Sequence, residues 1–456
     1  MLLSKQLGNT ATWLQPKKVS ASPQSRRPSV TARAVQELQR RKDTVTEVAG
    51  RQLKTYRIDA PSEVVSSQQE SDEGPKSLFA LPALFLPRGY PESVTPDYLD
   101  YQLWAFPSHV LGWLSISLVT SSLLKAVGLG SSATGAAAAG AAIKWITKDG
   151  AGSIGRLVVG GRLRGVFDED PKRWRMIAEG FATTGLALSI ATELVPGQFV
   201  LLAGLGNLTK AVGKGMSKPC FRIIQTHFAR QNNVGSIAAT EEVWEVAAQL
   251  LGLILSIGVL KGIQATEVPQ NVLWVWALAQ TGHVTLRYKS LSSLQLAVVN
   301  QKRACLLIRS HLRGLPLPGR QECNAQEPLL QSAATFEPAV QLGCTVEEAF
   351  REQPSYALAD HLRLFGQEQY LLVWQQGKGR LVLKQGAQPR DEIRALWQAG
   401  WLWNQAVKSA SKEQLSSSLA ALQQSFADFE QQATAAGWNI NSACICSGES
   451  RLLAKS

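Results

Sequence analysis

The feature that most constrains this chain is a series of apolar segments without Asp, Glu, Lys or Arg. They are Leu111–Leu124, Val127–Ile143, Leu194–Thr209, Val246–Leu260 and Val268–Leu286, the last of which contains His283. Most fall short of the roughly 20 apolar residues that cross a bilayer as a helix, and they also contain Ser, Thr and Gln. A soluble helical bundle therefore stays open as an alternative. Because such segments recur within one region, we favour a membrane-embedded or membrane-bound helical domain.

Local signals over residues 77–300 predict helices. Thr95-Pro96-Asp97 combines an N-cap, a proline at the first helical position and an acid in the first turn, and Asp170-Pro171 repeats this arrangement. Small residues dominate positions 135–142, which would let two helices approach closely. The sequence thus predicts a mainly α protein whose larger part is a Gly/Ala-rich multi-helix domain over residues 77–300.

The hydrophobic period changes toward the C-terminus. Residues 370–375 and 380–385 are short β-rich runs on either side of Gln376-Gly-Lys-Gly379, which predicts a β-hairpin. Helices are expected from Pro389 and over residues 415–435. We expect a small α+β domain (a β-hairpin plus two helices) over residues 351–440 and a tail over residues 441–456. Residues 301–350 contain proline breaks and are predicted to be an irregular linker.

Charge is concentrated at the N-terminus. Residues 1–36 contain six Lys and Arg and no acid, so the formal charge of the remaining 420 residues is 12 − 6 = +6. A positive, hydroxyl-rich and acid-free segment is typical of an organelle transit peptide, here for a plastid, although a disordered basic tail has the same composition. Residues 37–76 are polar and charged and are expected to be a disordered linker. The mild charge of the remainder does not predict a nucleic-acid partner.

A glycine-rich loop is the first candidate binding site. Gly150-Ala-Gly-Ser-Ile-Gly155 matches the dinucleotide fingerprint in letters, but it follows a helical run rather than a strand, so we reject that assignment. Cations flank the loop at Lys144, Lys148, Arg156, Arg162 and Arg164. We hypothesise that Lys148, Gly150, Gly152 and Arg156 hold a phosphate, for which pyridoxal phosphate is a candidate. The alternative is a plain helix–helix turn.

A second basic pattern follows. Lys210, Lys214, Lys218 and Arg222 recur every four residues, so the first three would share one helix face, and Pro219 is expected to end that helix. This stripe would contact anionic lipid or a phosphorylated ligand. A face that is merely solvated explains the spacing equally well.

Catalytic signals are weak throughout the chain. The acids Asp168, Glu169 and Asp170 stand at a predicted helix start, which favours anions without any chemistry. The five histidines are far apart in sequence, and the six cysteines lack the spacing of a zinc site or of a disulfide framework. We therefore expect no metal site and no enzyme.

Three short blocks carry a family resemblance. They are residues 85–104, 148–156 and 167–175, and the residues on which it rests are Pro87, Tyr90, Pro91, Pro96, Asp97, Tyr98, Tyr101, Gln102, Asp149, Asp168, Asp170, Pro171 and Trp174. In this order and spacing the blocks resemble the signature of the root UVB-sensitive family. The segment Trp104-Ala-Phe-Pro-Ser-His109 departs from the family pattern by its proline, which leaves the equivalence of the next helix open.

The resemblance implies a role in ultraviolet-B tolerance, vitamin B6 homeostasis and early development, a paralogous partner and a chloroplast location. It supplies no catalytic residues. Our leading hypothesis is a non-enzymatic, membrane-associated plastid protein that acts through a paralogous family member in a hetero-oligomer. A membrane carrier for a small anionic metabolite is the alternative, and a soluble enzyme that binds a phosphorylated cofactor is the third hypothesis.

Overall fold

The structure is a computed structural model of the 456-residue chain. It describes residues 43–49, 52–58, 66–70, 84–127, 140, 142–150, 166–265, 271–351, 357–445, 448 and 450–453. The chain divides into a small N-terminal unit within residues 1–76 and a larger unit over residues 77–456. Residues 1–36, and with them the predicted transit peptide, lie outside the described residues.

The N-terminal unit is a three-stranded antiparallel sheet. Its strands are β1 (Asp43–Ala49), β2 (Gln52–Ile58) and β3 (Ser66–Glu70), in the order β1-β2-β3. Val45 pairs with Tyr56, and Val48 pairs with Leu53. The prediction of a disordered linker over residues 37–76 is therefore wrong for these segments. The polar composition of the whole stretch concealed short runs of β-branched and aromatic residues, which favour strands.

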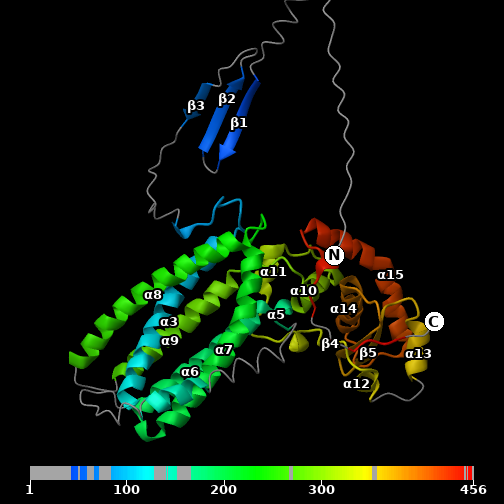
Figure 1. Ribbon diagram of the computed structural model, residues 1–456. Coiled ribbons are helices and arrows are strands. Elements are labelled where there is room, and N and C mark those ends of the chain that lie inside the picture. Colours follow the sequence, from blue (N-terminus) through cyan, green and yellow to red (C-terminus); the bar gives the residue numbers. More distant parts are fainter. Residues whose placement is uncertain are drawn as a thin grey trace, which may run out of the picture. The chain divides into compact units, whose positions relative to one another are not determined.

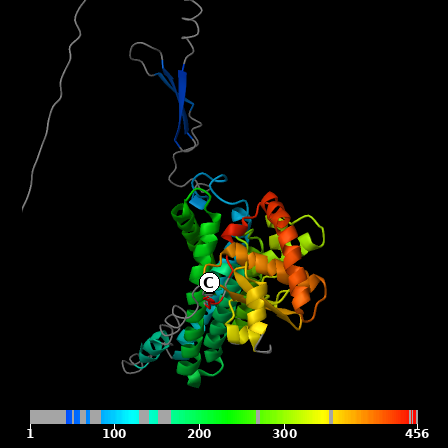
Figure 2. The same ribbon diagram turned by 90° about the vertical axis from the view of Figure 1, so that its right-hand side faces the viewer.

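Five long helices form the first part of the larger unit (Figures 1 and 2). They are α3 (Tyr98–Val127), α6 (Pro171–Ile190), α7 (Phe199–Phe228), α8 (Val234–Ala265) and α9 (Asn271–Ser292). Helix α3 packs against α6, α8 and α9, and α6 lies along α7. Neither proline inside these helices interrupts them: α3 continues through Pro107 and α7 continues through Pro219. The prediction that Pro219 ends its helix is wrong.

The start of α3 is fixed to the end of α7. Asp97 is buried, and its Oδ2 lies 2.9 Å from Nε2 of His227 and accepts a 2.6 Å hydrogen bond from the backbone N–H of Gln295. Tyr98 meets the ring of Phe228 edge-on. Helix α3 begins at Tyr98, two residues after the predicted first helical position at Pro96, and Asp97 joins three segments.

The third family block, residues 167–175, builds the start of α6. Asp170 is the N-cap, its side chain accepts from the backbone N–H of Arg173, and Pro171 opens the helix. Trp174 packs edge-on against Phe167 of the short helix α5 (Val166–Glu169). This helix start is as the sequence predicts.

The C-terminal part has its own hydrophobic core around a three-stranded sheet. The strand order is β4 (Val340–Leu342), β6 (Lys378–Leu383) and β5 (Tyr370–Gln375), with β4 parallel and β5 antiparallel to β6. Gln376 and Gly377 both have positive φ, as a tight hairpin turn requires. The predicted hairpin is confirmed, and so is the class of a mainly α protein with a small α+β part.

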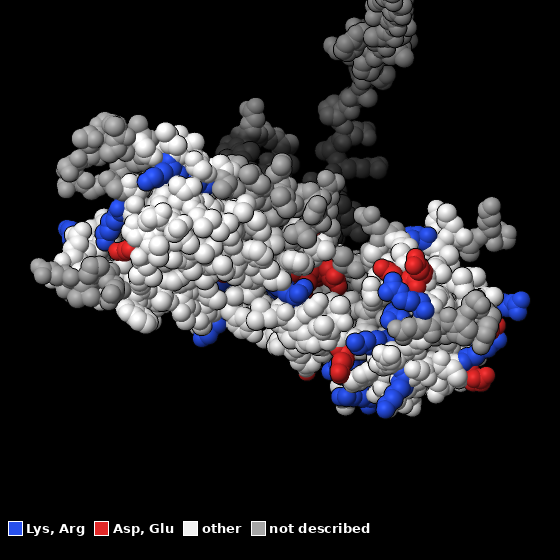
Figure 3. All heavy atoms as spheres, turned by 90° about the horizontal axis from the view of Figure 1, so that it is seen from below, with Lys and Arg blue, Asp and Glu red and all other residues white. Residues whose placement is uncertain are grey.

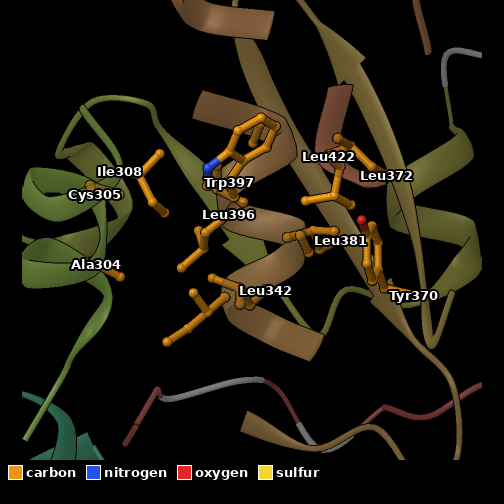
Figure 4. Packing of buried hydrophobic residues seen from close by; sticks show 14 of the residues in the cluster. Ala304, Cys305, Ile308, Leu342, Tyr370, Leu372, Leu381, Leu396, Trp397 and Leu422 are labelled. Carbon is orange, nitrogen blue, oxygen red and sulfur yellow. The ribbon is translucent and has the colours of Figure 1, made fainter. Parts of the chain in front are cut away.

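Helices pack around the sheet and complete this core (Figure 4). The main ones are α14 (Pro389–Asn404) and α15 (Lys412–Ala435), each of which begins with a capping box. Smaller helices are α12 (Val346–Phe350) and α13 (Ala357–Leu364). Trp397 and Leu396 of α14 point toward the strand residues Leu372 and Leu381 and toward Ile308.

The prediction of an irregular linker over residues 301–350 is wrong. They contain α10 (Gln301–Leu312), α11 (Arg320–Gln326), β4 and α12, and α10 packs against α14. Cys305, Leu307 and Ile308 of α10 are buried in the C-terminal core. Asn300 caps α10 by accepting from the N–H of Arg303. The prolines at 316 and 318 follow this helix and do not interrupt it, so the C-terminal core includes residues from Val299 onward.

A buried ionic cluster joins the helical and C-terminal parts. Glu327 accepts two hydrogen bonds from Arg303, at 2.9 and 2.8 Å, and lies 3.5 Å from Lys302 Nζ. Lys302 also pairs at 2.8 Å with Asp170, the N-cap of α6. Burial opposes charge on Glu327, but Arg303, Lys172 and Lys302 outweigh it and lower the pKa of this carboxyl to about 2. Glu327 therefore stays ionised in the link between the two parts.

We expect Arg303→Met to lower the free energy of unfolding by about 3–5 kcal/mol, because Glu327 would remain buried without its main partner. Urea denaturation measures this loss. The matched control is Arg390→Met, which removes the same type of contact with Glu430 at the surface and should cost at most about 1 kcal/mol. Equal losses in the two variants would contradict the role of burial.

Candidate functional site

A cavity of about 440 Å³ lies inside the helical part of the larger unit. Helices α3, α6, α7 and α9 form most of its walls, and the helical residues 142–150 contribute Trp145 and Lys148. Ligand cavities commonly measure about 300–1,000 Å³ and combine apolar walls with a few polar groups. This cavity has that size and that composition.

Glu179 of α6 organises one end of the cavity. Its Oε2 accepts a 2.9 Å hydrogen bond from Arg175, and its Oε1 lies 2.7 Å from Nε2 of His283. The opposite ring nitrogen of His283 lies 2.6 Å from the backbone carbonyl of Ser108. Both ring nitrogens of His283 thus face oxygen atoms. Burial opposes the charge of Glu179, but His283 and Arg175 outweigh it and hold the pKa of this carboxyl well below its usual range.

A serine, a histidine and an acid meet here as in a catalytic triad, namely Ser108, His283 and Glu179. A substrate in the cavity would not reach the serine. The hydroxyl of Ser108 lies 3.1 Å from Nδ1 of His283, yet it donates to the carbonyl of His283. Ser108 is fully buried and is not among the residues that line the cavity. A nucleophile must reach a substrate carbonyl, so this arrangement holds α3 to α9 and does not form an active site. Gly112 makes room for it, since a Cβ there would come 3.1 Å from the His283 ring.

Two further buried side chains face the same end with spare hydrogen-bonding capacity. Arg287 is only 2% exposed, its Nε has no hydrogen-bond partner, and its Nη2 lies 3.4 Å from His109. Gln280 donates through Nε2 to Thr183, while its Oε1 has no partner. Both residues line the cavity.

Lysines gather at the other end. Lys148 is buried, lies 4.3 Å over the Trp145 ring and pairs with Asp149 at 2.8 Å. Lys210 of α7 lies across Gly185 of α6, where a Cβ would come 2.6 Å from its Cγ. Burial and the neighbouring Lys148 and Lys214 lower the pKa of Lys210 to about 8. This end concentrates positive charge beside an apolar wall.

The structure only partly brings together the predicted phosphate-binding residues. Lys148 lines the cavity, whereas Gly150 is exposed and has open space around its Cα. Gly152, Arg156, Arg162 and Arg164 lie outside the described residues. Lys144 borders a separate open depression with residues 196–205. Of the basic stripe, Lys210 and Lys214 line the cavity with Lys148, while Lys218 and Arg222 do not.

Sequence reasoning missed the polar end of the cavity. Glu179 and Arg287 are ionisable residues in otherwise apolar surroundings, and His283 stands within an apolar segment. Such residues in apolar helices usually have a functional or pairing role, and this signal could have drawn attention to them. It could not have revealed their contact, because Glu179 and His283 are 104 positions apart.

No group of three or more His, Cys, Asp or Glu that could hold a metal ion is found among the described residues. Asp170 serves as a helix cap and an ion-pair partner. Within the described part of the chain, Cys220, Cys305, Cys323 and Cys344 are free thiols. Burial raises the pKa of Cys305 and Cys323 to about 12, which makes them poor nucleophiles.

The outer surface of the helical part is unusually apolar. Helix α8 exposes Leu250, Ile254 and Ile257, and α9 exposes Trp274 and Leu278, both more than three-quarters accessible. Figure 3 shows few charged atoms on this part, whereas Lys, Arg, Asp and Glu stud the C-terminal part. By length and composition, α3 and α8 are the described helices that could cross a membrane.

Comparison with known proteins identifies two matching regions. Residues 72–314 match the family described as "Vitamin B6 photo-protection and homoeostasis domain", and residues 317–452 match "Root UVB sensitive protein, C-terminal". The chain is 40% identical to Arabidopsis thaliana "Protein root UVB sensitive 5" over 82% of its length and 77% of the relative. "Protein root UVB sensitive 6" of the same plant is 27% identical over 83% and 80%.

A third relative from Arabidopsis thaliana, "Protein root UVB sensitive 2, chloroplastic", is 27% identical over 72% of this chain and 73% of its own length. No solved structure matches the chain. The boundary between the two matching regions falls just after α10, although α10 packs into the C-terminal core.

Close packing at the α6–α7 crossing sets the position of Lys210 and generates a stability prediction. A Cβ at Gly206 would lie 2.7 Å from the Gly185 carbonyl oxygen, whereas one at Gly204 would meet nothing. Gly206→Ala should therefore cost about 1–3 kcal/mol through overpacking. Gly204→Ala should stabilise by about 0.5–1 kcal/mol, because alanine is the better helix former. Thermal denaturation of the two variants measures the contrast, and a stabilising Gly206→Ala would rule out the crossing as described.

Proposed function

The chain belongs to the root UVB sensitive family, and on that premise we propose that it is a non-enzymatic, membrane-associated plastid protein. It acts with a paralogous family member in vitamin B6 homeostasis and ultraviolet-B tolerance. The observation that carries the membrane part of this proposal is the exposed apolar surface of α8 and α9.

The size of this surface favours lipid over water. Helix α8 exposes seven large apolar side chains between Val246 and Ile257, where a soluble helix would alternate them with charges. Only 17% of its most apolar 18-residue window is buried. Water contact over so large an apolar area is unfavourable, and such patches mark interaction sites. The exposure of these side chains thus supports membrane contact, which the borderline hydropathy of the sequence alone left open.

Polar and aromatic residues mark a boundary at one end of the helices. On α3, Trp104 is exposed and lies 4.6 Å from the ammonium group of Lys289 on α9, next to the exposed Tyr288. The acids of α8 precede Val246 in sequence. Trp, Tyr and Lys are enriched where a membrane meets water. The residues of α3 without Asp, Glu, Lys or Arg extend from position 101 to 124, about 36 Å of helix at 1.5 Å per residue.

The non-enzymatic assignment is supported by the state of the ionisable groups. Glu179 and His283 are engaged in a buried pair, and Ser108 is shielded from the cavity. A working nucleophile and base need a substrate within reach of both. The plastid and the paralogous partner are supported by the basic N-terminus, by the name of the chloroplastic relative and by several paralogues in one plant.

A membrane carrier for a small anionic metabolite is the second candidate. The cavity favours it, because five cationic side chains and two acids line a space enclosed by apolar helices. Uptake of an anion into vesicles that contain the purified protein would distinguish a carrier from a protein that only binds.

Membrane association is tested by alkaline carbonate extraction. The wild-type protein should remain in the membrane pellet, and Leu250→Glu combined with Ile254→Glu should move it to the supernatant, since each carboxylate costs about 2.5–3.5 kcal/mol in a bilayer. The control pair Leu315→Glu and Leu330→Glu changes equally exposed apolar residues of the C-terminal half and should leave the protein in the pellet. Full recovery of the wild type as soluble protein would defeat the membrane assignment.

Plastid targeting has a separate test. Residues 1–36 fused to a fluorescent reporter should direct it to plastids, and replacing the six Lys and Arg of that segment by Gln should reduce import. A cytosolic or mitochondrial signal from the unaltered fusion would reject this localisation without affecting the membrane assignment.

A further inference from the structure

The cavity carries more positive charge than its own acids neutralise. The charged residues in its lining are Lys148, Arg175, Lys210, Lys214 and Arg287 against Glu179 and Glu245. Glu179 forms ion pairs with Arg175 and His283, and Asp149 forms one with Lys148. Among the described residues, no ion pair of Lys210 or Lys214 is found. Like charges held together in a partly buried space repel one another, so this end is unfavourable until an anion enters it.

The opposite end offers directional hydrogen bonding. Arg287 Nε lies 3.8 Å from Glu179 Oε2 without a hydrogen bond, and Gln280 Oε1 also lacks a hydrogen bond, although both side chains are buried. A buried polar atom without a partner is costly, and such atoms call for water or a ligand. Together they present one donor and one acceptor to whatever occupies the cavity.

Apolar side chains lie between these two ends. Ile116 of α3 and Leu186 of α6 line the cavity together with Trp113 and Trp145. Glu179 and Leu186 are seven residues apart on α6, which corresponds to about 10 Å along a helix. That length suits a single ring that bears a charged group at one end.

We propose that this cavity binds a small phosphate monoester with a planar apolar body. The phosphate lies among Lys148, Lys210 and Lys214, whose ammonium groups act as point charges toward its oxygens. The body packs along the apolar wall, and a polar substituent on it exchanges hydrogen bonds with Arg287 and Gln280. A dianionic group fits better than a carboxylate, because two lysines without ion pairs stand at this end.

The inference deepens the second candidate function, since it names the ligand class of the same cavity, but it requires neither transport nor a membrane. Binding is measured on the purified protein in detergent, whereas membrane association is read from extraction. A protein that extracts as soluble and still binds would separate the two conclusions.

The test is calorimetric titration of the full-length protein with phenyl phosphate. The wild type should bind it, and inorganic phosphate should bind more weakly, because it lacks the apolar body. Lys210→Met should weaken phenyl phosphate binding roughly tenfold or more, since it removes a charge-assisted contact. The same variant should raise the thermal midpoint of the ligand-free protein, because it also removes a repulsive charge. A purely structural lysine would not produce this opposite pair of effects.

The matched control is Lys218→Met, which changes a lysine two turns further along α7 that does not line the cavity. It should leave affinity within about twofold. Absence of binding by the folded wild type would overturn the inference, as would equal losses in Lys210→Met and Lys218→Met. Equal affinity for inorganic phosphate and phenyl phosphate would overturn the assignment of a planar apolar body.

Discussion

The helical part depends on the cost of placing charge in an apolar interior. Glu179 of α6 is buried where this helix packs against α3, α7 and α9, and a lone carboxylate there would be strongly unfavourable. Arg175 on its own helix and His283 on α9 compensate that charge. The contact with His283 in turn places α9 against Ser108 of α3, with Gly112 providing the space. One buried carboxylate thus fixes how three helices meet, and the cavity is the space that this arrangement leaves open.

The junction with the C-terminal part treats buried charge differently. There Glu327, Asp170, Lys302 and Arg303 satisfy one another at short range, and the cluster lines none of the described pockets. This cluster fixes the helical part and the C-terminal part relative to each other. The cavity, by contrast, leaves Arg287 and Gln280 with spare capacity. Buried polar atoms without a hydrogen bond also occur away from the cavity, as at Tyr98 and Trp397, so the argument for a ligand rests on the surplus of cations in the cavity lining.

Local chemistry decided which elements could be predicted from the sequence. Asp170-Pro171 and the turn at Gln376-Gly377 have their own caps or backbone requirements, so they were found where expected. Helix α10 was not predicted, because prolines follow it closely in the sequence. Its apolar face is recognisable only where it packs against α14. Pro219 misled in the opposite direction, since the packing of α7 along α6 maintains a helix that a single proline weakens. The cavity could not be predicted, because it requires the register between Gly185 and Gly206.

The exposed apolar surface and the cation-lined cavity belong to the same group of helices. Apolar side chains of α3 and α6 form part of the cavity wall, beside the buried Lys148 and the half-buried Lys210. Charges in such surroundings interact more strongly than at a hydrated surface, so these two lysines attract an anion and repel each other more strongly than the exposed Lys214 does. Burial, and after it the neighbouring Lys148 and Lys214, lower the pKa of Lys210. The binding potential of this chain therefore lies in where the helices carry their cations, and Lys148 is the residue that the loop hypothesis and the cavity share.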